Sequence, residues 1–526
     1  MPDVTLIRGD RTDLLSAHPG ETLLDLLGRC GVSFYAPCGG GHTCGKCRVK
    51  ATGALSAMSD EEAILLGSAR EAGVRLACFA RVEGEATVTL QAPAEAQTGE
   101  NSPAPSEPAG ETEPLGFAAD LGTTTVALSL FGLKSRRLLS TESALNPQRT
   151  FGADVIARID AAGKGALPAL QTSIVGALND MLSFVCRKAG AAVERVQKGV
   201  IAANTTMLHL LRGLDPASIA QAPFTPKSLF GGDVPAGELG LSIDPNAPVH
   251  LIRCLSAYVG GDITAGILAA DLGNPKENAL LIDIGTNGEM ALSRGREIFC
   301  CSVAAGPALE GARIRYGMGG VPGAINQVTL TKEGLSVTTI GGEPAAGICG
   351  SGLLDAAAAL LDCGAVDETG RMDGEELPPA LAGRFLALDG QPAFLLSKEQ
   401  GIAVTQQDIR ELQLAKAAFA AGIALLLKEA GLTEAEVDRV VLAGSFGCAL
   451  NPKSACRIGL LPAAFLPKTQ AGGNTAGLGA GAVLLEDGAR ARLTQIAWDA
   501  KYLELSGRAD FNDAYVDAML FPDGEE

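Results

Sequence analysis

The sequence has little basic charge for its length. Its 526 residues include 42 Lys and Arg against 60 Asp and Glu, and the formal net charge is −18. A chain this acidic repels phosphate backbones, which argues against a nucleic-acid partner. Long hydrophobic runs are also absent: the longest strongly apolar run, residues 417–427, is too short to span a bilayer. The first residues lack a basic stretch followed by an apolar one, so no secretory signal is expected. We therefore expect a cytoplasmic protein whose partners include neither nucleic acid nor a membrane.

Cysteine is sparse as well. The chain has 13 cysteines, too few for a disulfide scaffold at this length. Those beyond residue 78 are scattered, mostly in apolar surroundings, and are expected to be small buried side chains. Four of the earlier ones are spaced as metal ligands often are: Cys38, Cys44, Cys47 and Cys78.

One segment cannot contribute to a core. Residues 91–114 hold five prolines and five glutamates, and their only aliphatic side chains are alanines. This composition is typical of a flexible linker, which would let a small N-terminal unit move between positions. We therefore divide the chain into an N-terminal domain (1–90), the linker (91–114), a middle domain (115–205) and a C-terminal domain (206–526).

The stretch PCGGGHTCGKC, residues 37–47, has three interpretations. Gly40 to Lys46 fits the phosphate-loop pattern G-x-x-x-x-G-K, but Cys47 stands where Ser or Thr should bind magnesium, and no apolar strand leads into the loop. Four cysteines could hold zinc, although zinc sites usually have two C-x2-C knuckles and only one is present. Plant-type [2Fe–2S] ferredoxins use C-x4-C-x2-C and a distant fourth cysteine, one residue shorter in the first gap. The spacing favours an iron–sulfur site, with zinc as the alternative.

The rest of the N-terminal unit is consistent with a small α+β domain. Residues 4–9 and 82–91 have strand character, and residues 21–32 have apolar positions at helical spacing. With the cysteine loop, these features resemble a [2Fe–2S] ferredoxin domain of the β-grasp type, with the longer first gap of the adrenodoxin-like branch. The glycines suit a loop that wraps a cluster closely and directs amides at sulfur. The resemblance implies a [2Fe–2S] cluster with four ligands: Cys38, Cys44, Cys47 and Cys78.

The larger unit repeats a strand followed by a D-x-G-T turn. Asp120 ends the first such strand and Asp283 the second, and a third strand runs into a glycine turn at residues 440–447. An Asp at a strand end can hold magnesium or its waters, and a Gly-Thr turn offers backbone N–H groups and hydroxyls to phosphates. Any one of these could be an ordinary β-turn, but three in this order predict a nucleotide site in a duplicated fold.

These motifs resemble the phosphate and adenosine motifs of the actin, sugar-kinase and Hsp70 ATPase superfamily. The resemblance implies that Asp120 and Asp283 act on Mg²⁺–ATP, and that GICGSGLLD (347–355) enters a helix at the nucleotide cleft. Ser445 stands where the superfamily usually has a second glycine. The implied nucleotide-binding residues are Gly122, Thr123, Thr124, Gly285, Thr286, Asn287, Gly350, Ser351, Gly352, Gly444, Ser445, Phe446 and Gly447.

A narrower resemblance covers nearly the whole chain outside the linker. It is carried by NPQRTFGADVIARI (146–159), ANTTMLHLL (203–211), AYVGGDITAG (257–266), SVAAGPALEGARIRYGM (302–318), TQQDIRELQLAKAAFAAGI (405–423) and KYLELS (501–506). With a ferredoxin domain and a linker, these stretches resemble the reductive activators of corrinoid-dependent methyltransferases.

The resemblance implies a multidomain α+β and α/β chain: a β-grasp ferredoxin domain, a flexible linker and a duplicated RNase H-like ATPase fold. It further implies ATP-dependent reduction of inactive Co(II) to Co(I) in a partner corrinoid protein, with a cellular electron donor and a homodimeric state. No corrinoid-binding D-x-H-x-x-G motif is present, so the corrinoid should belong to the partner.

Other functions remain open at this point. One is a sugar or small-acid kinase, another an activator of 2-hydroxyacyl-CoA dehydratases, and a third a redox-sensing module that binds nucleotide without turnover. Two acidic residues are ambiguous as well. Glu310 and Arg313 either line the cleft, contact the partner protein or are solvated charges, and the last is favoured. Asp262 either caps a helix or contacts substrate.

Overall fold

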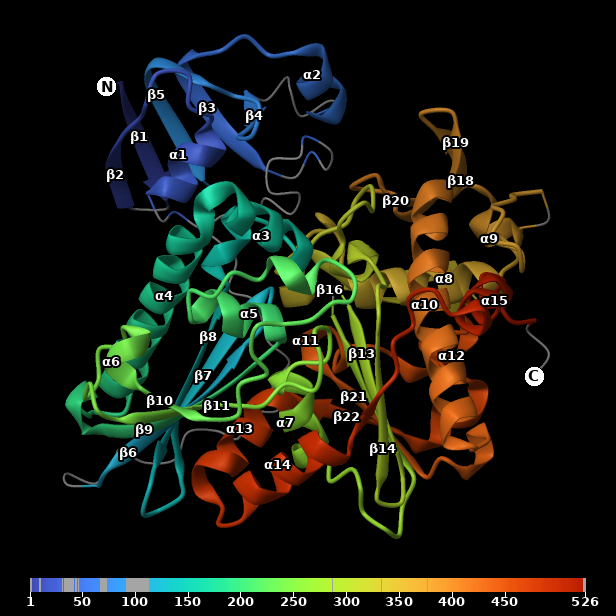
Figure 1. Ribbon diagram of the computed structural model, residues 1–526. Helices are drawn as coiled ribbons and strands as arrows, with labels where there is room; N and C mark the ends of the chain where they lie inside the picture. The colour runs from blue at the N-terminus through green and yellow to red at the C-terminus, as the bar shows by residue number, and fades with distance from the viewer. Residues whose placement is uncertain are drawn as a thin grey trace.

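The computed structural model forms five β-sheets in three parts, shown in Figure 1. Cys38, Cys44 and Thr286, most of the linker and the side chain of Ser445 lie outside what the structure describes. The described residues are 2–8, 11–30, 32, 42, 45, 47–66, 73–90, 113–285, 287–332, 334–375 and 377–523.

The N-terminal domain is a five-stranded sheet in the order β2-β1-β5-β3-β4, with helix α1 packed on it. Its central strands β1 and β5 are parallel, and α1 buries Leu23, Leu24, Leu26 and Leu27 against the sheet. The predicted strands and helix are thus present, and the β-grasp arrangement is confirmed. The elements are β1 (Asp3–Arg8), β2 (Arg11–Ser16), α1 (Leu23–Arg29), β3 (Arg48–Leu55), α2 (Asp60–Leu66), β4 (Val74–Leu76) and β5 (Val82–Leu90).

The first half of the ATPase fold is built on a six-stranded sheet in the order β10-β11-β9-β6-β7-β8. Strands β6, β7 and β8 form an antiparallel meander, and β9 and β11 continue the sheet in parallel beyond β6. The predicted division after residue 205 falls just behind β9, whereas this sheet continues to β11. The elements are β6 (Leu115–Leu121), β7 (Thr125–Gly132), β8 (Leu138–Leu145), α3 (Val155–Ala161), α4 (Leu167–Lys188), β9 (Val196–Ala203), α5 (Thr205–Leu211), β10 (Asp233–Pro235), α6 (Ala236–Leu239) and β11 (Pro248–Leu251).

The second half repeats this topology in the sheet β22-β21-β12-β13-β14-β23. Here β12, β13 and β14 form the antiparallel meander, and β21 and β22 extend the sheet in parallel beyond β12. The predicted duplication is therefore confirmed. The elements are β12 (Ala279–Ile284), β13 (Gly288–Arg294), β14 (Glu297–Val303), α8 (Gly350–Asp362), α10 (Gln406–Ala430), β21 (Arg439–Ala443), α11 (Gly444–Gly447), α12 (Pro452–Arg457), β22 (Thr469–Gly473), β23 (Lys501–Tyr502) and α15 (Ala509–Asp517).

Two smaller three-stranded sheets are inserted in this second half. Their orders are β16-β15-β17 and β18-β19-β20. The elements are β15 (Ala324–Thr331), β16 (Gly334–Thr339), β17 (Gly347–Ile348), α9 (Pro379–Ala382), β18 (Phe385–Leu388), β19 (Gln391–Ser397) and β20 (Ile402–Thr405).

Three helices, α7 (Gly261–Ala269), α13 (Thr475–Leu485) and α14 (Ala489–Asp499), lie between the two large sheets (Figure 1). Small side chains let α7 and α13 cross closely: a Cβ on Gly479 would lie 2.1 Å from the carbonyl oxygen of Ala265. Their apolar side chains form one buried cluster with residues of both sheets, among them Ala118 of β6 and Leu281 of β12. The crossed pair therefore joins the halves at the base of the cleft between them.

The helical stretch Val155–Lys188, which contains α3 and α4, is long and apolar enough to cross a membrane by length and composition. In the structure, Leu170, Ile174, Leu178 and Leu182 of α4 are fully buried in the core cluster of the first sheet. The apolar face of α4 thus serves the interior of this domain.

Candidate functional site

The two described cluster cysteines lie side by side in the N-terminal domain. Cys47 precedes β3 and Cys78 follows β4, and the two strands pair antiparallel. The two Sγ atoms are 3.3 Å apart, and the residues are only 2% and 4% exposed. The backbone N–H of Ala77 donates to the carbonyl oxygen of Cys47 (2.8 Å), which holds the chain before β3 against the chain after β4. Two thiols this close can bind the same metal ion, which fits the predicted cluster site.

Contacts that sequence reasoning missed position the segment around Cys78. The ring nitrogen Nε2 of His42, in the cysteine loop, lies 3.0 Å from the carbonyl oxygen of Cys78, and the ring stacks on Phe79. On the other side, the buried Glu62 carboxylate of α2 accepts hydrogen bonds from the backbone N–H of Leu76 and the guanidinium of Arg75. These contacts secure the chain on both sides of the fourth predicted ligand.

The first predicted phosphate loop is the turn between β6 and β7. Two side chains fix its backbone: Asn146 donates to the carbonyl oxygen of Gly122 (2.8 Å), and Arg158 donates to that of Thr123 (2.6 Å). The hydroxyl of Thr123 accepts a hydrogen bond from the side-chain amide of Asn204 (2.9 Å). The loop is therefore held from behind by side chains that its own sequence motif does not contain.

Arg158 is the most unusual of these supports, because its charged side chain is fully buried. It also donates to the carbonyl oxygen of Gly152 (3.0 Å) and lies near Gln148 and Met207. The pKa of Arg158 is lowered to about 9, chiefly by burial and also by the neighbouring Arg149, while Asp154 and Glu310 oppose the shift. A buried guanidinium thus stands directly behind the loop predicted to hold phosphate.

The second and third predicted loops meet each other across neighbouring strands. Asp283 ends β12, and the parallel strand β21 runs into Gly444 beside it. Gly444 has a φ of +83°, and a Cβ there would lie 2.6 Å from Oδ1 of Asp283. The turn at 444–447 therefore requires glycine at its first position for both conformation and space.

These loops surround a cavity of about 450 Å³ between the two halves. Of the predicted residues, it is lined by Asp120, Gly122, Thr123, Thr124, Asp283, Gly285, Asn287 and Gly444.

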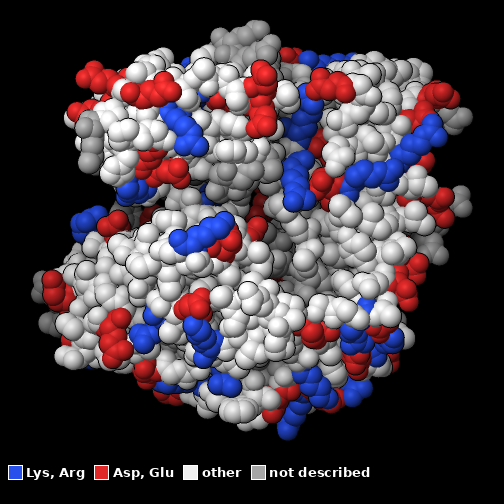
Figure 2. Space-filling model, turned by 45° about the horizontal axis from the view of Figure 1, so that its top comes forward, with Lys and Arg blue, Asp and Glu red and all other residues white. Residues whose placement is uncertain are grey.

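The walls of this cavity are acidic. Six lining side chains are carboxylates, namely Asp120, Asp154, Asp262, Asp283, Glu289 and Glu310, and none of the described lining residues is Lys, Arg or His. On the molecular face in Figure 2, in contrast, Lys and Arg are interspersed with Asp and Glu. The cavity therefore concentrates negative charge, whereas charges of both signs are mixed on the face in Figure 2.

The crowding raises the pKa of several of these carboxyl groups. Burial raises the pKa of Asp120 to about 8, and the carboxylates of Asp262 and Asp283 add to the shift. Burial also raises the pKa of Asp283 to about 7, that of Asp262 to about 6, and that of Glu289 well above its usual range. Protons or cations must balance this charge before a polyphosphate can enter.

A cation here would need ligands from outside the protein. Among the described residues, no three Asp, Glu, His or Cys side chains converge as a ready metal site. Magnesium usually keeps several waters and binds one or two carboxylates together with substrate phosphates. Asp120 and Asp283 fit that pattern, because each stands at a strand end beside a phosphate loop.

The glycine turn at 350–352 does not line the cavity among the described residues. It begins α8, where a Cβ on Gly350 would lie 2.0 Å from the carbonyl oxygen of Leu309 and 2.4 Å from the ring of Phe446. Ser351 donates to the carbonyl oxygen of Asn326 (3.0 Å). The glycines here permit close backbone packing behind the cleft, which a sequence motif does not distinguish from phosphate binding.

The two ambiguous acidic residues both face the cavity. Glu310 accepts a hydrogen bond from the hydroxyl of Thr124 (2.9 Å), whereas its neighbour Arg313 points outward with 68% of its side chain exposed. Glu310 is thus not the solvated charge that was favoured. Asp262, in the first turn of α7, accepts from the backbone N–H of Ile263 (2.8 Å) and also lines the cavity. Asp262 therefore stabilises the start of α7 and also faces the predicted nucleotide site.

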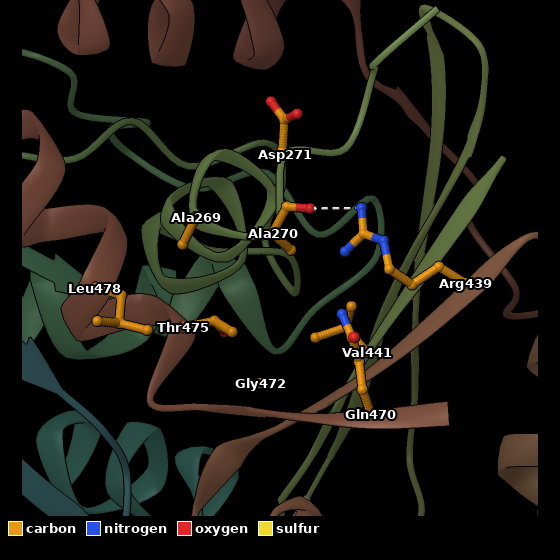
Figure 3. Close-up of a pocket in the computed structure, with 9 residues that line it drawn as sticks. All are labelled: Ala269, Ala270, Asp271, Arg439, Val441, Gln470, Gly472, Thr475 and Leu478. Carbon is orange, nitrogen blue, oxygen red and sulfur yellow. Dashed lines mark hydrogen bonds between the residues drawn. The ribbon is translucent and has the colours of Figure 1, made fainter. Parts of the chain in front are cut away.

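A second cavity of about 370 Å³ lies beside the first and shares Gly472 and Leu478 with it. Figure 3 shows that Arg439 of β21 reaches toward the end of α7, where it donates to the carbonyl oxygen of Ala270 (2.9 Å). The guanidinium also forms a two-pronged ion pair with Glu277. Arg439 is thus engaged within the protein, and none of the residues that line this second cavity belongs to the predicted site.

Family profiles match three consecutive parts of the chain. A 2Fe-2S iron-sulfur cluster binding domain matches residues 9–83, the RACo middle region matches residues 115–275, and the C-terminal ASKHA domain of RACo matches residues 277–526. These matches support a [2Fe–2S] cluster in the first part and nucleotide binding in the last.

Curated relatives and a solved structure extend over most of the chain. The corrinoid activation enzyme RamQ of Eubacterium limosum is 35% identical over 78% of this chain and 70% of its own. The Co(II) methylated amine-specific corrinoid protein reductase of Methanosarcina barkeri is 26% identical over 76% of each chain. A solved reductive activator for a corrinoid, iron–sulfur protein covers 99% of this chain and 98% of its own, with 29% identity and a TM-score of 0.70. The resemblance expected from the sequence motifs is confirmed.

Proposed function

The chain belongs to the RACo family, and from that premise we propose that it reductively activates a corrinoid protein, using ATP and one electron to convert Co(II) to Co(I). The observation that carries the proposal is the joint presence of the close Cys47–Cys78 pair and the acid-lined cleft in one chain. The similarity to RamQ across 78% of the chain supports the corrinoid protein as partner.

The N-terminal domain handles the electron. Cys38, Cys44, Cys47 and Cys78 hold a [2Fe–2S] cluster, which supplies one-electron transfer at low potential when bound. The domain receives its electron from a low-potential cellular donor. His42 and Glu62 keep the Cys78 segment in place, and the buried position of the two described thiols shields the site from water.

The two-sheet cleft handles the nucleotide. The backbone N–H groups and hydroxyls of the β6–β7 and β12–β13 turns hold the phosphates, and Asp120 and Asp283 would hold Mg²⁺. A bound Mg²⁺ would supply positive charge that reduces the repulsion between these carboxylates and ATP. Because the two turns belong to different halves, nucleotide binding favours closure of the cleft about α7 and α13.

Energy from ATP is needed because the electron moves uphill. Plant-type clusters have potentials near roughly −400 mV, and the Co(II)/Co(I) couple is expected to lie lower. For one electron, a gap of about 60 mV corresponds to roughly 1.4 kcal/mol. A gap of one or two hundred millivolts is therefore a few kcal/mol, which differential binding between two cleft states can supply.

The test is an anaerobic assay with the full chain, reductant, a Co(II) corrinoid protein from a methyltransferase system, and Mg²⁺–ATP. The wild type should show a [2Fe–2S] EPR signal on reduction and a growing Co(I) absorbance only when ATP is present. Cys47→Ser should abolish Co(I) formation while leaving ATP affinity unchanged, because the two sites lie in separate domains.

Cys30→Ser is the matched control. Cys30 is an exposed cysteine of the same domain, at the end of α1, and its replacement should leave both activities intact. Equal loss of electron transfer and nucleotide binding in Cys47→Ser would contradict the division of labour. A cluster signal with no Co(I) from any corrinoid protein would overturn the proposed function.

A further inference from the structure

A carboxylate from the second half of the ATPase fold reaches across the cleft to the first phosphate loop. Glu310 ends the short 3₁₀ helix Pro307–Glu310, which follows β14. Its Oε1 accepts the hydroxyl hydrogen bond of Thr124, 2.9 Å away, in the turn that follows β6. Both residues line the cavity of about 450 Å³. The hydrogen bond therefore joins the two halves at the place where phosphate is expected.

The support of Glu310 is firm on its own side. The carbonyl oxygen of Leu309, its neighbour, is packed so closely on Gly350 of α8 that a Cβ there would lie 2.0 Å away. Ala308 and Leu309 are each 2% exposed in the core of the second half. The carboxylate thus projects into the cleft from a packed backbone, and its position follows the position of the whole second half.

The other acidic residues of the cavity are placed differently. Asp120 and Asp283 stand at strand ends, where they suit a hydrated cation. Asp262 accepts a hydrogen bond from the backbone of its own helix, and Asp154 does the same at the start of α3. Among the hydrogen bonds of the described residues, Glu310 is the carboxylate bonded to a hydroxyl of the predicted phosphate loops.

The surroundings of Glu310 suit a group that acts on a phosphate. Arg158 lies behind the same loop, holds the carbonyl oxygen of Thr123 and is within electrostatic range of Glu310. A phosphate held by the loop would compete with the Glu310 carboxylate for the hydroxyl of Thr124, and would therefore lie next to that carboxylate. A water molecule bound between the carboxylate and the phosphorus atom would be in position for attack.

We propose that Glu310 is the general base that activates water for hydrolysis of ATP in this cleft, an inference that rests on the proposed function. The water oxygen forms a bond to the γ-phosphorus while the bond from this phosphorus to the β,γ-bridging oxygen breaks. The electron pair of the broken bond stays on ADP, and the proton of the water passes to the Glu310 carboxylate and then to solvent. Because base and loop belong to different halves, hydrolysis requires the closed cleft.

Glu310→Gln tests this role, because glutamine keeps an oxygen that can accept from Thr124 but cannot take up the proton. The probe is Mg²⁺–ATP, with phosphate release and equilibrium binding measured separately on the holoenzyme. We expect kcat to fall about 100- to 10,000-fold, the usual range for removing a general base, while the Kd for ATP changes less than about threefold. Glu310→Asp, with a retracted carboxylate, should recover part of kcat.

Glu343→Gln is the control: Glu343 is exposed and does not line the cavity, so its replacement should leave both constants unchanged. A Glu310→Gln protein that hydrolyses ATP within tenfold of the wild type would overturn the proposal. Loss of ATP binding in that variant would also overturn it and make Glu310 a binding residue. The proposal would also be overturned if the wild type did not hydrolyse ATP when the corrinoid protein is present.

These outcomes are separate from those of the proposed function. A wild type that hydrolyses ATP but never forms Co(I) contradicts corrinoid activation and leaves the role of Glu310 in force. If the wild type forms Co(I) and Glu310→Gln hydrolyses ATP at the normal rate, corrinoid activation stands and the role of Glu310 as a general base is contradicted.

Discussion

Replacing the buried Arg158 should weaken nucleotide binding although this side chain does not line the cavity. Its guanidinium donates to the carbonyl oxygen of Thr123 over 2.6 Å and to that of Gly152 over 3.0 Å. The first contact fixes the phosphate loop, and the second fixes the chain before α3. Arg158→Met removes both while filling similar space.

The expected loss of ATP affinity can be worked out from the hydrogen bond between Arg158 and the carbonyl oxygen of Thr123. A hydrogen bond from a charged donor contributes about 1.5–3 kcal/mol. If the loop must be reordered when ATP binds, the Kd should rise roughly 10- to 100-fold, since about 1.4 kcal/mol corresponds to a tenfold change. The free energy of unfolding is a poorer measure, because removing a buried charge offsets part of the lost hydrogen bonding.

The assay is equilibrium binding of Mg²⁺–ATP to the wild type, Arg158→Met and Arg158→Lys. Lysine retains the charge but not the planar fork, so its affinity should be intermediate. Arg187→Met, at an exposed position of α4, is the control for loss of a surface arginine. A Kd for Arg158→Met equal to that of the wild type would refute the claim that this residue positions the loop.

Two further substitutions test the fold and the site. Burial lowers the pKa of Lys416 from 10.5 to about 8, so the unfolded chain binds this proton more tightly than the folded one. The contribution of Lys416 to the free energy of unfolding should therefore rise by about 3 kcal/mol between pH 8 and 10.5. Lys416→Met should raise the melting temperature at pH 7 and flatten its rise with pH in calorimetry; equal destabilisation at pH 7 and pH 10 would contradict this. Gly444→Ala should weaken Mg²⁺–ATP binding at least tenfold in the same binding assay, because its Cβ would displace Asp283. Gly342→Ala has a similar positive φ in open space and should bind normally; comparable losses in both would attribute the effect to backbone strain alone.

Local sequence patterns were sufficient to predict those features that depend on residue type and short spacing. Cys47 and Cys78, which the spacing singled out, lie side by side because Cys47 directly precedes β3, Cys78 follows β4, and these two strands pair. Asp120 and Asp283 line the cleft because each stands near the end of the corresponding strand in its sheet, β6 in the first half and β12 in the second. The duplicated sheet topology follows from the same repeated pattern.

Some features had a local signal that pointed to more than one structure. The GICGSG turn resembles a phosphate loop, yet its Gly350 serves close packing on Leu309 and Phe446. The strand β11, which extends the first sheet beyond residue 205, has only four residues, and its pairing with β9 depends on the chain returning after a long excursion. In both cases the alternatives differ in tertiary contacts and hardly at all in local sequence.

By itself, then, the sequence determined the iron–sulfur domain, the strand-end carboxylates and the family, because each of these depends on residue types and spacings over short stretches. Only the tertiary structure decided which charges act on the phosphate loop. Glu310 lies 186 residues from Thr124, and Arg158 lies 35 residues from Thr123. Glu310 and Thr124 are brought together by the packing of the two sheets on the crossed helices α7 and α13, whereas Arg158 reaches Thr123 because α3 packs behind the loop within the first half. No periodicity along the chain records either contact.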